Sequence, residues 1–218
     1  MRQRIAIALL FVTPLAGGCD NAKPLTSENT ETRSSRPSSP DALEGFLGEE
    51  ARKVGCSIAL DYAQRQFRDA ERPIVLEDTG PTGTLMPDDQ ANSLITYIFE
   101  GDAGDPESER NKTKSKAFVA LSKESVIADC DALSDLNDDR GFTPDPAQEQ
   151  PPATPDGLFY EYETFILAKP LVDLESGKAI MRTAHGCGPL CGSSGIEIYT
   201  RQANGEWTQA DYLGLSIS

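Results

Sequence analysis

The chain has 218 residues, enough for one ordinary domain with appendages, and its formal net charge is −15 at pH 7. A chain this acidic repels nucleic acid and anionic lipid headgroups. Its composition therefore argues against a nucleic-acid-binding protein and favours cationic partners or metal ions. After the first twenty residues, no stretch is long and apolar enough to cross a membrane as a helix.

Residues 1–18 have the parts of a signal peptide. Arg2 and Arg4 form a positive start, and residues 5–15 form an apolar segment that is too short for a stable transmembrane helix. Small residues follow directly. We therefore expect an exported chain that loses residues 1–18. Because the two arginines leave with this segment, the formal charge goes from −15 to −17.

Small residues at 16–18 lead into Cys19, and this end resembles the lipobox of bacterial lipoproteins. One position departs from the family's pattern, because Leu15 lies four residues before the cysteine, where three is usual. The resemblance implies that Cys19 carries lipid, palmitate included, and becomes the new N-terminus. Each buried methylene contributes about 0.8 kcal/mol to membrane binding. The expected location is the cell envelope, facing the periplasm and anchored in the inner or outer membrane. An ordinary secreted protein is the alternative.

Residues 19–40 contain the lipidated cysteine and a segment rich in Ser, Thr, Asn and Pro, which cannot bury enough apolar surface to become ordered. We expect a flexible tether there, followed by a single α+β domain over residues 41–218. A Ser-Pro-Asp start and apolar residues at helical spacing predict a long helix over 41–70, with a kink near Gly55.

The middle of the chain predicts shorter elements. An apolar run at 73–76 is typical of a strand, and two aspartates can cap a helix over 88–99. The expected elements that follow are a polar loop over 101–115, a strand over 117–121, a short helix over 124–136 that carries Cys130, and a proline-rich, disordered-like loop at about 137–157.

The C-terminal third predicts an antiparallel meander. Its expected strands are 159–167, 179–184, 196–201 and 206–212. Asn204-Gly205 is the strongest hairpin signal in the chain, and Trp207 is expected to pack on the sheet. The predicted fold class is α+β, with N-terminal helices followed by a C-terminal antiparallel β-meander.

Residues 185–195 read His-Gly-Cys-Gly-Pro-Leu-Cys-Gly-Ser-Ser-Gly and hold the only histidine and two of the five cysteines. Together with Asn-Gly-Glu-Trp at 204–207, this stretch is similar to the end of many uncharacterised exported bacterial proteins. Those proteins show a Cys-Gly-x-Leu-Cys-Gly-x-Gly loop and an Asn-Gly-x-Trp turn. The resemblance covers about a quarter of the chain, supports the hairpin and implies no activity.

Four cysteines besides Cys19 are expected to form disulfides, because export places them in an oxidising compartment. Three connectivities are possible. We favour the pair Cys187 and Cys191, whose short loop costs little entropy to close between glycines. The remaining pair, Cys56 and Cys130, would then join the first helix to the middle of the chain.

His185, Cys187 and Cys191 also form a candidate thiol-redox centre or a copper or zinc site with one imidazole and two thiolates. The C-x-x-x-C spacing has one residue more than a thioredoxin motif, no helix is expected after it, and the chain has no second histidine. An oxidised pair could not bind a metal. We therefore prefer a structural bridge beside a locally hydrogen-bonded histidine.

Asp135, Asn137 and Asp139 alternate in the manner of calcium ligands. The glycine that a calcium loop needs is displaced to Gly141, and Pro146 stands where the closing glutamate should be. A solvated acidic helix end and loop is the simpler interpretation of this stretch.

Glu161 and Glu163 share one face of an expected strand, and paired carboxylates can serve acid–base catalysis. A solvent-facing sheet surface also explains them. Ser193 lies in a glycine-rich loop, but no nucleophile elbow surrounds it, so a pairing with His185 has weak support.

These observations predict a membrane-tethered envelope lipoprotein whose domain is a binding or interaction module rather than an enzyme. The lipid on Cys19 is the only cofactor expected, and a cationic protein is the partner class that the charge favours. The alternative is an envelope thiol-redox or copper/zinc-binding protein that uses His185, Cys187 and Cys191. The sequence identifies no specific partner or substrate.

Overall fold

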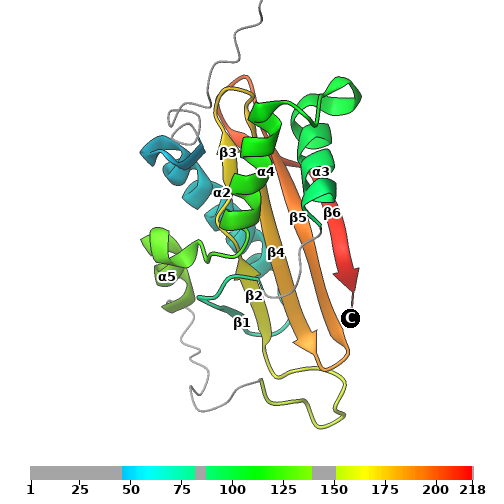
Figure 1. The fold of residues 1–218 in the computed structure, drawn as a ribbon. Coiled ribbons are helices and arrows are strands. Elements are labelled where there is room, and N and C mark those ends of the chain that lie inside the picture. The colour runs from blue at the N-terminus through cyan, green and yellow to red at the C-terminus, as the bar shows by residue number, and fades with distance from the viewer. Residues whose placement is uncertain (1–45, 82–86, 139–150, 218) are drawn as a thin grey trace, which may run out of the picture. The chain divides into compact units, whose positions relative to one another are not determined.

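The computed structural model describes residues 46–81, 87–138 and 151–217 (Figure 1). The expected signal peptide, Cys19 and the tether to residue 40 lie outside the described residues, and so do residues 139–150 of the expected loop. Within the described ranges, no helix has the length and apolar character that a membrane crossing requires.

Helices dominate the first part of the described chain. They are α2 (Glu49–Asp69), α3 (Asp88–Glu100), the 3-10 helix η1 (Gly101–Ala103), α4 (Glu109–Leu121), the 3-10 helix η2 (Ile127–Asp129) and α5 (Asp131–Asp138). Acidic residues in the first turn of α2 and Arg68 in its last turn suit the helix dipole. Gly55, where a kink was expected, does not end the helix, because α2 continues through it to Asp69. A Cβ at Gly55 would lie 3.5 Å from Pro170, so the glycine is where α2 approaches the chain before the sheet's third strand.

The strands form one six-stranded sheet in the order β1-β2-β4-β5-β6, with β3 also paired to β4. Their bounds are β1 (Ile74–Leu76), β2 (Glu163–Leu167), β3 (Leu171–Asp173), β4 (Lys178–Gly188), β5 (Cys191–Arg201) and β6 (Trp207–Ile217). β1 and β2 are parallel, and all other pairs are antiparallel. β4, β5 and β6 are joined by two successive hairpins, of which the second turns at Asn204-Gly205 with Gly205 at φ 89°.

The sheet lies between two helical layers, with α2 behind it and α3 and α4 in front in Figure 1. Successive residues of a strand point to opposite faces, so β4 directs Ala179 and Met181 toward α2 and Ile180 toward α3 and α4. We call these two surfaces the α2 face and the α4 face. Both carry buried apolar clusters, which fix the register of the strands because a one-residue slip would exchange the faces.

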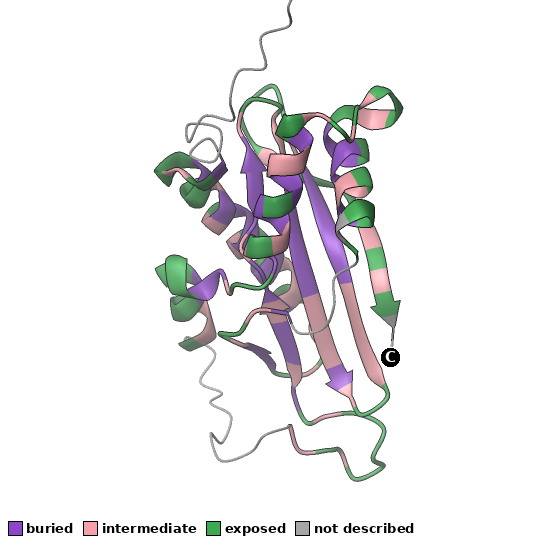
Figure 2. Cartoon of the chain, in the orientation of Figure 1, coloured by how far each residue is buried: buried purple, intermediate pink, exposed green. Residues whose placement is uncertain are grey.

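Burial weakens along β4 and β5 toward the hairpin that joins them (Figure 2). Residues 179–183 and 195–199 are buried, whereas 184–186 and 191–194 are only partly so. The helical layers therefore cover the sheet less at the end that carries the cysteine hairpin.

The expected loop over 101–115 and strand over 117–121 are wrong, because one helix, α4, occupies Glu109–Leu121. The Ser108 hydroxyl caps it by accepting a hydrogen bond from the backbone N–H of Asn111 at 3.3 Å. The helix buries polar residues, Asn111 and Lys114 among them, and this obscures the apolar period on which the sequence prediction relied.

The expected fold class is confirmed, since helices over 49–138 precede an antiparallel-rich sheet. Helix 88–99 and strand 73–76 are found within one residue of their predicted ends. The expected helix over 124–136 is divided into η2 and α5, with Cys130 between them. β4 and β5 extend through most of the expected cysteine loop and leave only Pro189 and Leu190 as the turn.

Both favoured cysteine pairs are bonded in the structure. Cys56 joins Cys130 across 74 positions, with Cα atoms 5.4 Å apart, and so attaches α2 to the segment before α5. Cys187 joins Cys191 across the hairpin tip, with Cα atoms 5.1 Å apart. The first bridge therefore crosslinks two helical segments, and the second crosslinks the two strands of the β4–β5 hairpin at its tip.

Candidate functional site

A groove of about 530 Å³ lies on the α2 face, where the sheet extends past the C-terminal end of α2. We call it the sheet groove. Its wall on the helix side comes from residues 62–72, and its floor comes from β2, β4, β5 and β6. The side chains that matter below are Tyr62, Arg72, Glu163, His185, Glu197 and Tyr212. The volume lies within the range of small-molecule sites in proteins, about 300–1,000 Å³.

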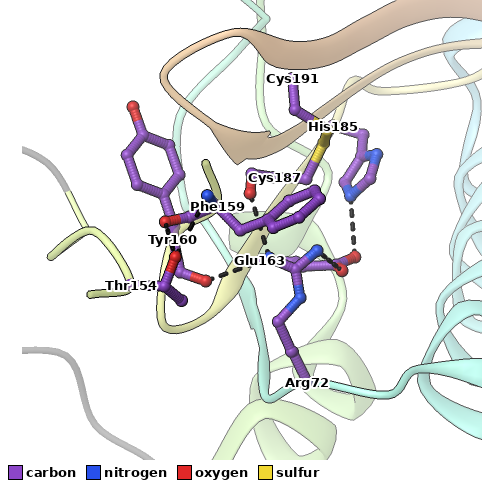
Figure 3. Close-up of a disulfide and its surroundings, with 8 residues drawn as sticks. All are labelled: Arg72, Thr154, Phe159, Tyr160, Glu163, His185, Cys187 and Cys191. Carbon is purple, nitrogen blue, oxygen red and sulfur yellow. Dashed lines mark hydrogen bonds and ion pairs between the residues drawn. A yellow bond between two sulfur atoms is a disulfide. The ribbon is translucent and has the colours of Figure 1, made fainter. Parts of the chain in front are cut away.

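Glu163 connects the only histidine to an arginine at one end of the groove (Figure 3). Its Oε2 lies 2.8 Å from Nε2 of His185, and its Oε1 lies 2.6 Å from Nη2 of Arg72. An ionised carboxylate only accepts hydrogen bonds, so the imidazole nitrogen is the donor. The ring of His185 also stacks on Phe165, with centroids 4.3 Å apart. The imidazole is thus fixed in position and orientation.

Arg72 also fastens the cysteine hairpin to the preceding loop. Its Nη1 donates to the carbonyl oxygens of Tyr160 at 3.0 Å and Cys187 at 3.1 Å, and its guanidinium lies 4.8 Å from the ring centroid of Phe159 (Figure 3). A Cβ at Gly188 would meet the carbonyl oxygen of Leu158 at 2.5 Å, so the loop and hairpin are in close contact. The donors of the Arg72 guanidinium are therefore engaged by Glu163 and by two backbone carbonyls of the protein itself.

Glu197 lies in the floor of the sheet groove and is only 3% exposed. Gln209 donates a hydrogen bond to its Oε2, and the Thr183 hydroxyl contacts it as well. Burial raises the pKa of Glu197 to about 7, although the nearby charge of Arg65 and the Thr183 hydrogen bond act to lower it. The groove therefore contains a carboxyl group whose charge changes near neutral pH.

Arg65 is close to Glu197 but is held by other groups. It pairs with Asp61 at 3.1 Å, donates to the Tyr199 hydroxyl at 3.0 Å and donates to the side-chain oxygen of Gln209. The side-chain amide of Gln209 therefore bridges the two residues, accepting from Arg65 and donating to Glu197. Arg65 and Glu197 do not form an ion pair themselves. Burial is the main cause that raises the pKa of Tyr199, so its hydroxyl stays protonated at neutral pH.

Two tyrosines border Glu197. Burial, followed by the charge of Glu197, raises the pKa of Tyr62, which keeps this hydroxyl neutral. Tyr212 projects from β6 over Gly195, where an added Cβ would meet the tyrosine ring at 2.2 Å. Gly195 thus creates the space in which the Tyr212 ring lies against the sheet.

The proposed metal or redox set, His185, Cys187 and Cys191, comes together only in part. The two sulfur atoms are bonded to each other, and the histidine is engaged by Glu163. Across the parts of the chain that the structure describes, no three His, Cys, Asp or Glu side chains gather as a metal-binding group. While the bridge is intact, neither cysteine offers a thiolate.

Two of the three candidate calcium residues lie in a helix instead of a loop. Asp135 and Asn137 belong to α5, and Asp139 lies outside the described residues. Asn137 uses its side-chain amide on β1, accepting from the Leu76 N–H at 3.1 Å and donating to the Leu76 carbonyl at 3.3 Å. Its observed role is to attach α5 to the edge of the sheet.

Glu161 and Glu163 do not share a strand face, because β2 begins at Glu163 and exposed Glu161 precedes it. The solvent-facing interpretation is wrong for Glu163, whose side chain is 16% exposed and bonded to His185. Ser193 is the cross-strand neighbour of His185 and also lines the groove. It lies within strand β5 and not on a strained strand-to-helix turn, so the site lacks the geometry of a nucleophile elbow.

Sequence reasoning missed Arg72, Glu197 and Tyr212. One signal was present, because Glu197 stands between Ile196 and Ile198 and is followed by Tyr199. A carboxylate in such a run either faces solvent or is a buried polar group. Which of the two applies depends on whether a helix, here α2, covers that face of the sheet. No protein family, curated protein or solved structure matches the chain.

Proposed function

We propose that this chain is an exported, lipid-anchored envelope protein whose domain binds a ligand in the sheet groove. The observation that carries the proposal is the groove itself, in which polar groups from one helix end and four strands converge on a single concave surface. A concave site with a few fixed polar groups and a perturbed carboxyl group is the general form of a ligand site.

The two disulfides support the exported part of the proposal. Structural disulfides persist in oxidising compartments such as the bacterial periplasm and are rare in the cytosol. This agrees with the signal-peptide pattern of residues 1–18 and with the lipobox that ends at Cys19.

Binding fits the groove better than catalysis does. Arg72 and Glu163 are satisfied by each other and by the backbone, and His185 is held by Glu163, so these groups provide a rigid wall. The rival function, a thiol or metal protein that uses His185, Cys187 and Cys191, requires a reduced bridge. Alkylation of the native protein without reductant separates the two, since the structural bridge predicts no labelling of either cysteine.

The groove proposal is tested by amide chemical-shift mapping on the full chain in nonionic detergent micelles. Small libraries of cationic, neutral and anionic amino-acid derivatives serve as probes. We expect at least one class to shift the amides of residues 62–72, 183–186 and 193–197 in a saturable way. Saturable shifts confined to other surfaces, or none with any class, would refute the proposed site.

A further inference from the structure

We infer that the sheet groove receives a positively charged nitrogen group, an ammonium or a guanidinium, and that Glu197 is its main partner. The inference rests on the proposed function and adds the chemical class of the ligand. It depends on the balance of charge in the groove, on the surroundings of Glu197 and on the aromatic walls.

Carboxylates outnumber cations in the sheet groove. Among the described residues that line it, Asp69, Glu71, Glu163 and Glu197 are carboxylates and Arg72 is the one arginine. Because Glu163 and Arg72 pair with each other, the excess of negative charge comes from Asp69, Glu71 and Glu197. The guanidinium of Arg72 is already occupied by Glu163 and by two backbone carbonyls. The C-terminal end of α2, at Asp69, adds the negative end of a helix dipole to the same wall. The net field in the groove therefore attracts positive charge.

Glu197 is more than nine-tenths buried, and among the described residues no lysine, arginine or histidine forms an ion pair with it. Its donors are the neutral groups of Gln209 and Thr183. Arg65, whose charge acts on Glu197, is held by Asp61 and the Tyr199 hydroxyl. Burying an unpaired carboxylate is costly, so a cation that enters the groove gains a partner that the protein does not supply.

Aromatic rings line the same groove. Tyr62 belongs to its helix wall, Phe165 belongs to its floor, and Tyr212 closes it on the side of β6. The faces of such rings attract ammonium and guanidinium groups. Carboxylates with aromatic faces distinguish a cation site from a simple acidic surface, because the rings exclude water and strengthen the charge interaction.

The test uses isothermal titration calorimetry on the full chain in nonionic detergent at pH 8, where Glu197 is ionised. The probes are Nα-acetyl-arginine amide, its uncharged analogue Nα-acetyl-citrulline amide, Nα-acetyl-glutamate amide, and a capped Gly-Ser-Arg-Ser-Gly peptide. We expect the arginine derivatives to bind at least tenfold more tightly than the citrulline derivative. Tighter binding of the peptide than of the single residue assigns the cation to a polypeptide, and equal binding assigns it to a small molecule.

Glu197→Gln is the decisive variant, because it keeps the shape of the side chain and removes its charge. We expect it to weaken the arginine probe at least tenfold, whereas Glu161→Gln, the same change at an exposed site outside the groove, leaves affinity unchanged. Thermal unfolding confirms that both variants are folded.

Three results would overturn the inference. These are equal binding of arginine and citrulline probes, an equal loss in both variants, and groove binding by the glutamate or citrulline probe alone. The last result keeps the groove as a ligand site and removes only the cation. Absence of binding by every probe, together with absence of shifts in the mapping experiment, refutes the proposed function as well.

Discussion

Glu197 has a pKa in the folded protein of about 7, raised from 4.5 by burial. Between these two values the folded state holds a proton that the unfolded state has released, so stability falls as pH rises through this window. The shift corresponds to a loss of about 3 kcal/mol between pH 4.5 and pH 7, at 1.36 kcal/mol per pKa unit. Below pH 4.5 both states are protonated and this contribution is constant.

We therefore predict that Glu197→Gln flattens the stability curve in this window, because the amide does not ionise. Denaturant unfolding at half-unit steps from pH 4.5 to pH 8 measures the effect as the difference between variant and wild type. Other groups cancel in that difference. A constant difference across the window would show that Glu197 is charged and stabilised at neutral pH in the folded protein.

Gly195 allows the Tyr212 ring to lie on the sheet, and this contact gives a second prediction. The Cβ of Gly195→Ala would meet the ring at 2.2 Å, so the ring must move, and we expect a loss of about 1–3 kcal/mol in unfolding free energy. Gly214→Ala is the matched control, because its Cβ would lie 3.7 Å from the same ring, an ordinary contact. Denaturant melts of both variants compare them, and equal losses would contradict the proposed packing.

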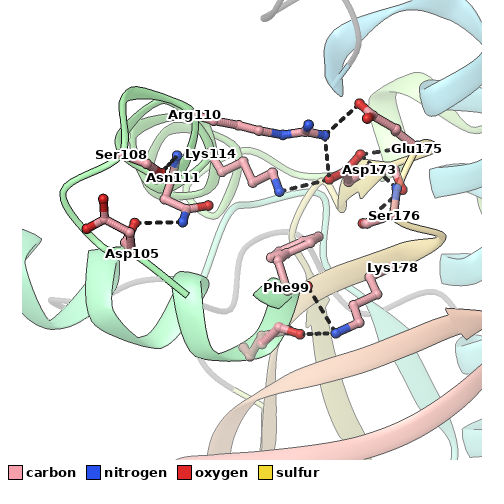
Figure 4. A network of polar contacts seen from close by, with 11 residues as sticks. Phe99, Asp105, Ser108, Arg110, Asn111, Lys114, Asp173, Glu175, Ser176 and Lys178 are labelled. Carbon is pink, nitrogen blue, oxygen red and sulfur yellow. Dashed lines mark hydrogen bonds and ion pairs between the residues drawn. The ribbon is translucent and has the colours of Figure 1, made fainter. Parts of the chain in front are cut away.

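At the scale of elements, α4 is attached to the sheet by a buried ion pair (Figure 4). The ammonium of Lys114 lies 2.9 Å from Asp173 and 4.6 Å from the ring centroid of Phe99, and both charged side chains are almost fully buried. The backbone N–H groups of Glu175 and Ser176 also donate to Asp173. Burial acts to raise the pKa of Asp173, but the hydrogen bond and charge of Lys114 outweigh it and lower the pKa.

We predict that Lys114→Met lowers the unfolding free energy by about 3–5 kcal/mol, because buried Asp173 then keeps only the longer contact with Arg110, at 3.5 Å, as a charged partner. Adding Asp173→Asn restores part of the loss, which a double-mutant cycle by denaturant unfolding measures. Lys112→Met is the control, since Lys112 pairs with exposed Glu107 and changes stability by less than about 1 kcal/mol. Equal effects at the two lysines would refute the stated role of the buried pair.

The same pair explains what the sequence could predict. Helix α3 and strands β4 to β6 follow apolar periods and turn residues, so their existence was predictable from local pattern. Helix α4 was not, because Lys114 occupies a core position whose partner, Asp173, is 59 residues away by the sequence numbering. Likewise His185 was identified by its rarity, whereas its link to Arg72 and the burial of Glu197 depend on contacts that form only after folding.

For the whole molecule, the proposed lipid anchor leads to a direct prediction. Cys19→Ser removes the thiol at the end of the lipobox to which lipid would be attached. The variant should therefore leave the membrane fraction and incorporate no labelled palmitate. Fractionation and radiolabelling of wild type and variant give the measurement. Cys56→Ser with Cys130→Ser is the control, since it removes two cysteines without touching the lipobox. Wild-type protein without palmitate would refute the anchor.

Strand β6 forms one edge of the sheet, and its pairing with β5 is interrupted by irregularities at Ser194/Gly195 and at Ile198/Tyr199. A neighbouring copy that tried to add its own strand would need an unbroken ladder of N–H and C=O groups, which these bulges deny it. Anchored proteins collide often, because a membrane confines them to two dimensions. For the protein proposed here, the bulged β6 edge therefore disfavours edge-to-edge pairing of the sheets of neighbouring copies in a crowded leaflet.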